Sequence, residues 1–216
     1  MNTTTQHFIQ ELQANPDILG IILFGSWARG NNRPDSDVDL LVIVRHGSKR
    51  TVEYRECQAF EMTYTTEQAA IAYWQSNPND AIELWSIAKI LFDRDETVAR
   101  LRQTGDQIKA SGKSALTSEQ YEHYRFDVSD QMKAIETLAM SDSITAKMLL
   151  SSKVLQLTEL FFDVRQLWTP PPKQRLESIK NRNYDLYKLI RSYYDESSFV
   201  EQINIVRLII TIVFDT

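Results

Sequence analysis

The sequence is poor in cysteine, glycine and proline, and it contains no long hydrophobic run. Its single cysteine, Cys57, excludes an intramolecular disulfide framework and a multi-cysteine zinc site, and it fits a reducing compartment. Six glycines and six prolines in 216 residues exclude a collagen-like or low-complexity chain. The longest apolar stretch, residues 203–214, is interrupted by polar side chains and is shorter than the roughly 20 residues that span a bilayer. Residues 1–13 are polar and lack the pattern of a secretory signal, so we expect a cytoplasmic protein without a membrane span.

An excess of basic residues is also missing. The chain has 24 Lys and Arg against 29 Asp and Glu, which gives a formal net charge of −5. Proteins that follow a phosphate backbone need a basic surface, so extended nucleic acid is a poor candidate partner. One basic window, residues 173–191, fits a solvated helical face better than an anion site.

The first half of the chain alternates between strand-like and helix-like patterns. Continuous apolar runs predict strands at residues 18–24 and 37–44, and alternation predicts a third at residues 59–65. The polar stretch 45–56 between the last two has room for a turn and a further strand at residues 50–55. Apolar residues at helical spacing predict helices at residues 3–14, 66–75, 80–92 and 96–109. Together these patterns predict a small mixed β-sheet accompanied by helices.

The second half has a purely helical pattern. Apolar residues recur at helical spacing between residues 118 and 214, over roughly four or five helices and without a convincing strand. The small polar stretch 110–117 separates the halves, and Ser118 and Glu122 loosely resemble a helix-capping pair after it. We therefore predict an α+β protein, with a mixed α/β domain at residues 1–112 and an all-α helical bundle at residues 113–216.

The most informative segment runs from Leu23 to Val42. Gly25 and Ser26 directly follow a buried apolar run, where a residue without a side chain lets a phosphate approach the backbone. A helix that begins at Ser26 would direct its first amide groups at an anion, and Arg29 adds a cation. Ser36 places a hydroxyl just before the next strand. The segment therefore predicts a phosphate-binding cradle.

Acidic residues at the same place predict a metal site. Asp37 and Asp39 lie two residues apart on a predicted strand, so their side chains leave the same face of it. Carboxylates on one face repel each other unless a cation lies between them, and Mg²⁺ binds carboxylates together with substrate phosphate oxygens. Glu61, between the apolar residues Phe60 and Met62, is placed to complete a site for two Mg²⁺ ions from a neighbouring strand.

Two short motifs resemble the signature of the nucleotidyltransferase superfamily that includes DNA polymerase β: Gly25-Ser26-x-x-Arg29-Gly30 and Ser36-Asp37-x-Asp39-Leu40. The family's Gly-Ser pair matches Gly25 and Ser26. Its metal carboxylates match Asp37 and Asp39, and its third acidic residue falls most naturally on Glu61. A short core followed by a helical bundle is similar to the antibiotic-modifying branch, the aminoglycoside and lincosamide nucleotidyltransferases, and to the minimal nucleotidyltransferases.

This resemblance implies an enzyme that moves a nucleoside monophosphate, AMP in the leading interpretation, from ATP or another nucleoside triphosphate to a hydroxyl of a small acceptor. The reaction would use two Mg²⁺ ions and release pyrophosphate, and the acceptor class that the resemblance suggests is an aminoglycoside or lincosamide antibiotic. The triphosphate would be held by Gly25, Ser26, Arg29 and Ser36.

The helical domain would bind the acceptor, and in antibiotic-modifying relatives it can also provide a general base. Asp127 and Asp130 are the candidates here, because they lie three residues apart and therefore on one face of a predicted helix. Arg125 is close enough in sequence to orient one of them. The alternative interpretation of this segment is a solvent-exposed charged face.

Two other functions stay open. Minimal nucleotidyltransferases modify or neutralise a protein partner in toxin–antitoxin pairs, although they resemble only the first half of this chain. A catalytically silent nucleotide-binding sensor is the third interpretation. The sequence leaves open the acceptor, the preferred nucleotide and the oligomeric state, with a homodimer among the options.

Overall fold

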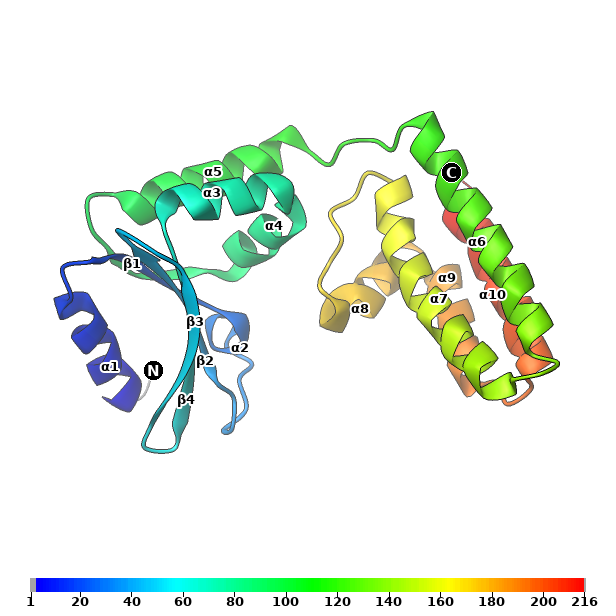
Figure 1. Ribbon diagram of the computed structural model, residues 1–216, viewed down its shortest axis with the longest axis horizontal. Coiled ribbons are helices and arrows are strands. Elements are labelled where there is room, and N and C mark those ends of the chain that lie inside the picture. Colours follow the sequence, from blue (N-terminus) through cyan, green and yellow to red (C-terminus); the bar gives the residue numbers. More distant parts are fainter. Residues whose placement is uncertain (1–2, 216) are drawn as a thin grey trace. The chain divides into compact units, whose positions relative to one another are not determined.

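The chain folds into two compact units, Met1–Ser111 and Gly112–Thr216. The computed structural model describes residues 3–215, and the terminal residues 1, 2 and 216, which fall within the predicted domain bounds, lie outside the described residues. The first unit contains a mixed β-sheet with helices and the second is helical, which confirms the predicted α+β class (Figure 1). No helix in residues 3–215 combines the length and the apolar character that a membrane crossing requires.

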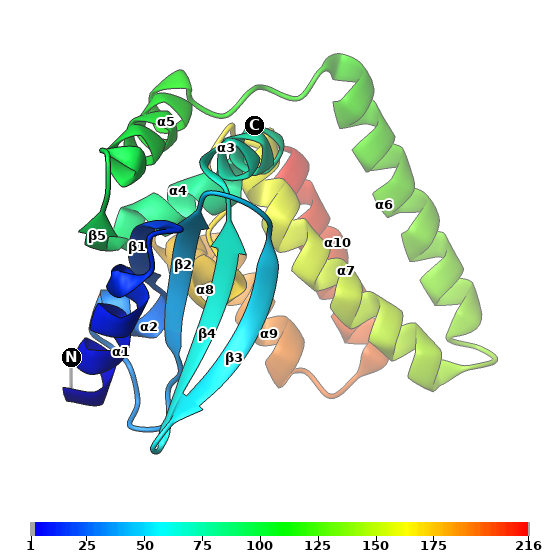
Figure 2. The same cartoon turned by 60° about the vertical axis from the view of Figure 1, so that its left-hand side comes forward.

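The first unit is built on a five-stranded sheet in the order β3-β4-β2-β1-β5. Strands β2 and β4 run parallel, and the other neighbouring strands pair antiparallel (Figure 2). The strands are β1 (Ile18–Phe24), β2 (Val38–Val44), β3 (Lys49–Arg55), β4 (Gln58–Thr65) and β5 (Lys89–Asp93). The helices of this unit are α1 (Thr3–Ala14), α2 (Gly25–Arg29), α3 (Glu67–Ser76), α4 (Pro78–Ile87) and α5 (Thr97–Ser111).

Alternation along the strands gives the sheet two packed faces. On one face, buried strand residues pack with Phe8 and Ile9 of α1; these strand residues are Ile21, Leu23, Val38, Leu40, Val42, Phe60 and Met62. On the other face, Ile22 and Ile43 pack with residues of α3, α4 and α5, including Trp74 of α3. Residues of β2 and β4 that alternate with the first set therefore lie on the face of α3–α5.

One helix prediction is wrong at its end. Helix α4 stops at Ile87, and the residues expected to continue it form β5 instead. Strand β5 pairs with β1 along the edge of the sheet, with Ile90 opposite Ile22 and Phe92 opposite Ile21. A short apolar run fits a helix or a strand equally well by pattern, and here the pairing with β1 decides the outcome.

The second unit contains five helices within its described residues: α6 (Ser118–Leu138), α7 (Ser143–Val164), α8 (Pro172–Arg182), α9 (Tyr184–Asp195) and α10 (Phe199–Phe214). They enclose a separate hydrophobic core that includes Leu150, Leu157 and Val206. Helix α6 begins with a capping box formed by Thr117 and Gln120, rather than by the expected Ser118 and Glu122.

Candidate active site

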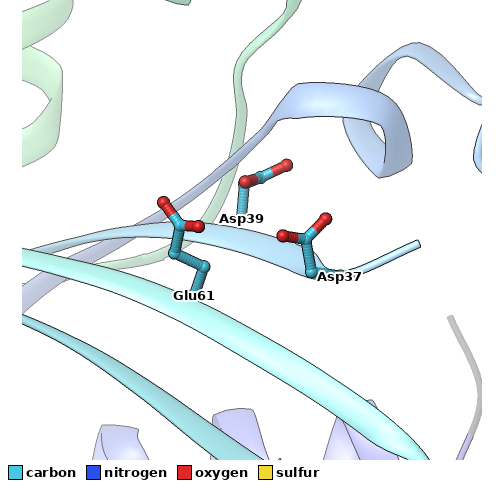
Figure 3. A group of neighbouring side chains, drawn as sticks. All are labelled: Asp37, Asp39 and Glu61. Carbon is cyan, nitrogen blue, oxygen red and sulfur yellow. The ribbon is translucent and has the colours of Figure 1, made fainter. Parts of the chain in front are cut away.

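Three carboxylates meet on the α3–α5 face of the sheet. Asp37 directly precedes β2, Asp39 lies on β2 and Glu61 lies on β4, and each offers an oxygen within 4.8 Å of the others. Figure 3 shows their side chains rising from the same side of the two strands. Asp37 is exposed, whereas Asp39 and Glu61 are half-buried. The structure thus brings together the three residues that the sequence predicts as metal ligands.

Buried neighbours in the strands produce this arrangement. The parallel register of β2 and β4 places Asp39 directly opposite Glu61. On the opposite face, four strand residues are fully buried: Val38, Leu40, Phe60 and Met62. Because side chains alternate along a strand, burial of these four residues forces both carboxylates onto the other face.

The donor set fits a magnesium ion. Mg²⁺ prefers oxygen ligands and binds through one or two protein carboxylates together with water and substrate phosphate. Three carboxylates this close would repel each other without a cation.

The structure also contains a partner of Glu61 that the sequence analysis missed, because Arg50 of the edge strand β3 forms an ion pair with Glu61. Arg50 lies 11 residues from Glu61 in sequence, and only the β3–β4 pairing brings them together.

Gly25 is required by its contact with Asp39. Gly25 has φ of +66°, and a Cβ atom built on it would lie 1.8 Å from Oδ2 of Asp39. The sequence analysis explains this glycine by the close approach of a phosphate to the backbone. The structure adds a second reason, since any side chain at this position would collide with a candidate metal ligand.

Of the other residues of the predicted phosphate cradle, Arg29 and Ser36 form hydrogen bonds within the protein. Ser26 is half-buried in α2, which begins directly after β1. The Nη2 atom of Arg29, in the last turn of α2, donates to Oε1 of Glu83 on α4 at 2.9 Å. The hydroxyl of Ser36 accepts a hydrogen bond from the backbone N–H of Arg33 at 2.9 Å, so it stabilises the loop before β2.

A cavity of about 670 Å³ adjoins the carboxylates, within the usual range for small-molecule sites. Its lining includes Gly25, Arg29 and Asp39. Helices α3 and α4 and strand β4 add aromatic, acidic and aliphatic side chains, among them Tyr64, Tyr73, Trp74, Asp80, Glu83 and Leu84. The Tyr73 hydroxyl donates to Asp80 at 2.5 Å, and this hydrogen bond to a carboxylate raises the pKa of Tyr73.

Asp127 and Asp130 belong to the second unit, on α6. Asp127 is half-buried and lies 3.2 Å from Nε2 of His123, whereas Asp130 is exposed. Arg125, which the sequence suggests as an orienting group, pairs with Glu122 at 3.5 Å. The role of the two aspartates as general base stays a prediction.

Comparison with known proteins relates part of the chain to a protein family. Residues 6–97 match a family model described as a nucleotidyltransferase domain. A candidate protein adenylyltransferase of Methanocaldococcus jannaschii is 42% identical over 55 residues, which cover 24% of this chain and 37% of that protein. The match therefore spans well under two thirds of the length of this curated relative.

A solved structure shows the same kind of fold as this chain. A nucleotidyltransferase-like protein from Exiguobacterium sibiricum superposes with a TM-score of 0.55 at 16% identity, covering 98% of this chain and 73% of that one. A spectinomycin adenyltransferase from Enterococcus faecialis, crystallised with ATP and spectinomycin, matches with a TM-score of 0.37 at 14% identity, and the match covers 98% of both chains. The family match confirms the resemblance seen in the sequence and identifies residues 6–97, which carry the three carboxylates, as a nucleotidyltransferase domain.

Proposed function

We propose that the chain is an enzyme that transfers a nucleoside monophosphate, AMP in the first instance, from a nucleoside triphosphate to an acceptor hydroxyl. The observation that carries this proposal is the cluster of Asp37, Asp39 and Glu61 beside Gly25, in a domain of the nucleotidyltransferase family. The name of the archaeal relative supports adenylyl as the transferred group.

The chemistry follows from the kinds of side chain in the cluster. Asp37, Asp39 and Glu61 would hold two Mg²⁺ ions, which supply charge neutralisation at the phosphates. The acceptor oxygen forms a bond to the α-phosphorus while the bond from this phosphorus to the bridging β-phosphate oxygen breaks, and pyrophosphate leaves. Gly25, Ser26, Arg29 and Ser36 would hold the triphosphate in line, and such positioning accounts for most of the acceleration in phosphoryl chemistry.

We further propose a small hydroxyl compound as the acceptor, with aminoglycoside and lincosamide antibiotics as the first candidates. The cavity beside the carboxylates supports this choice, because Asp80 in its wall suits a cationic amino sugar. In this proposal residues 1–112 form the catalytic domain, and the helical domain, residues 113–216, contributes to acceptor recognition. A homodimer is one assembly compatible with the proposal.

A protein acceptor is the second candidate function. It is favoured by one observation, namely that the archaeal relative is a candidate protein adenylyltransferase and is 42% identical to this chain over 55 residues. In that case the chain would modify or neutralise a protein partner, as minimal nucleotidyltransferases do in toxin–antitoxin pairs.

One experiment separates these functions. The full chain is incubated with Mg²⁺ and each α-³²P-labelled nucleoside triphosphate, alone and with a panel of aminoglycosides and lincosamides, while pyrophosphate release is followed. Pyrophosphate release that depends on an added antibiotic supports the first proposal, and label recovered on a co-purifying protein supports the second. Binding of ATP without release in any mixture would favour a silent sensor. The Asp39→Asn variant is the control for the site.

The general base has its own test. The acceptor proton must pass to a base, and we propose Asp127 or Asp130 for this role. Replacing the base by Asn should lower kcat by about 10²–10⁴-fold while the affinity for Mg²⁺-ATP stays unchanged. Full kcat in both the Asp127→Asn and the Asp130→Asn variants would exclude a base on this face of α6.

A further inference from the structure

Glu83 lies in the cavity wall and forms an ion pair with Arg29, the cation of the predicted phosphate cradle. Its Oε1 atom accepts from Nη2 of Arg29 at 2.9 Å, and both side chains line the cavity that contains Asp39. The Arg29 and Glu83 side chains are 24% and 38% exposed. The Nε atom of Arg29 is buried and has no hydrogen-bond partner among the described residues. The hydrogen bond to Glu83 therefore uses only one of the five N–H donors of the guanidinium group.

Helix α4 presents Glu83 from a firmly packed position. Ala81 and Trp85 of this helix are buried in the core on the α3–α5 face. Trp85 lies against Gly105 of α5, where a Cβ atom would come within 2.1 Å of its Cδ1 atom. Residues of the other face of α4, Asp80 and Glu83 among them, line the cavity. The carboxylate is therefore held by a fixed helix, and it restrains an arginine side chain that would otherwise lose much rotational freedom on binding a ligand.

The presence of a carboxylate beside a triphosphate site needs an explanation. An unpaired carboxylate there would repel the polyanion. A partly exposed ion pair contributes little to folding stability, so stabilisation of the contact between α2 and α4 does not explain why Glu83 lies here. A stronger reason is that the contact orients the guanidinium group, whose planar donors must match the phosphate oxygens. A group that is already oriented loses less conformational entropy when the ligand binds.

We propose that Glu83 is a positioning residue for the nucleotide: it orients Arg29 so that the remaining guanidinium donors meet the triphosphate. This inference rests on the proposed function of the same site. It assigns a role in nucleotide affinity to a residue of α4 that lies 54 positions from Arg29 and outside the sequence motifs.

A double-mutant cycle tests the inference. The affinity of the full chain for Mg²⁺-ATP is measured by calorimetry in the wild type, Glu83→Gln, Arg29→Ala and the double variant. Glu83→Gln should weaken binding about tenfold, which is a coupling in the usual range for contacting residues. In the Arg29→Ala background the same substitution should leave the affinity unchanged or improve it, since only repulsion between the carboxylate and the triphosphate is then removed.

A matched control is available in the same unit. Glu67 pairs with Arg100 at 2.7 Å, with side chains that are 28% and 49% exposed, and neither residue lines the cavity. Glu67→Gln should leave the affinity for Mg²⁺-ATP at the wild-type value. Thermal unfolding of every variant shows whether the fold is retained, and Glu83→Asp provides a second substitution should Glu83→Gln not fold.

Three results would overturn the inference. An unchanged or tighter affinity in Glu83→Gln would mean that Glu83 only joins the helices or competes with phosphate for Arg29. An equal loss in the Arg29→Ala background would mean that Glu83 acts independently of Arg29. A similar loss in Glu67→Gln would show an unspecific effect. If the wild type itself fails to bind Mg²⁺-ATP, the proposed function fails first, and this inference falls with it.

Discussion

Gly25 shows how much of the site depends on a single residue. Its positive φ is costly for any other amino acid, by about 1–3 kcal/mol, and its missing side chain leaves room for Asp39. We predict that Gly25→Ala displaces the Asp39 carboxylate and weakens Mg²⁺-dependent ATP binding about tenfold or more. Calorimetry with Mg²⁺ and ATP measures this loss.

The control for this substitution is Gly30→Ala. Gly30 has a similar φ of +77°, but a Cβ atom there would meet nothing within 4 Å. It should lose comparable folding stability and keep its affinity for Mg²⁺-ATP. Equal losses of affinity in the two variants would show that backbone strain, rather than contact with Asp39, accounts for the glycine.

Lys153 is a buried charged side chain in the helical unit. It is 3% exposed, its Nζ atom donates to Gln131 and Gln156, and burial lowers its pKa. Between the lowered pKa and the ordinary value of 10.5 the unfolded chain binds more protons than the folded one, so this group makes the protein more stable as pH rises. Below that window both states are protonated, and the folded state bears the full cost of burying the charge.

We therefore predict that Lys153→Met raises the urea midpoint at neutral pH and that this gain shrinks as pH approaches 10.5. Gln131 is exposed and can form a hydrogen bond with water in place of the lysine. Urea unfolding at pH 7 and pH 10 measures the effect, with the exposed Lys133→Met as control. A gain of the same size at both pH values would contradict the assignment.

Strand register decides which glutamate belongs to the candidate metal site. Glu61 lies opposite Asp39 in the parallel pair of β2 and β4. Glu56 lies in the turn between β3 and β4, where its carboxylate accepts from the hydroxyl of Thr4 at 2.8 Å. We predict that Glu61→Gln abolishes turnover and that Glu56→Gln retains it, as measured by pyrophosphate release. The reverse result would mean that the register of β4 is wrong.

The elements that the sequence predicts best are those with a local pattern. The alternating burial of β4 and the apolar run of β2 depend on residues that are adjacent in sequence. The spacing of Asp37 and Asp39, together with the apolar neighbours of Glu61, is enough to predict that the three carboxylates share a face. Strand β5 was missed because its conformation depends on pairing with β1, far away in sequence.

The same distinction applies to the contacts of the site. The ion pairs of Glu61 with Arg50 and of Arg29 with Glu83 join residues on different strands or helices. No spacing rule connects such residues, because the chain must first fold into a sheet and its covering helices. A basic residue on the edge strand and an acidic residue on α4 are too common in sequences to have indicated these roles.

The two units of the molecule have separate hydrophobic cores, with one cluster on each face of the sheet in the first unit and a single cluster in the helical unit. All of the candidate metal ligands and the cavity beside them lie in the first unit. We predict that residues 1–111 alone fold cooperatively and bind Mg²⁺-ATP with the affinity of the full chain, while acceptor-dependent turnover requires residues 112–216 as well. Calorimetry and pyrophosphate release on the two proteins provide the measurement, and turnover by residues 1–111 at the full rate would contradict the role proposed for the helical unit.

We propose that Asp37, Asp39 and Glu61 form a magnesium site for a nucleoside triphosphate. The most direct test is calorimetric titration of ATP into the wild type and into Asp39→Asn, each with and without Mg²⁺. Clustered carboxylates should repel ATP unless Mg²⁺ is present, so we expect wild-type affinity to rise about tenfold or more with Mg²⁺. Asp39→Asn should lose most of this dependence and keep its unfolding temperature. Equal affinity with and without Mg²⁺ in the wild type would contradict a magnesium site at these three residues.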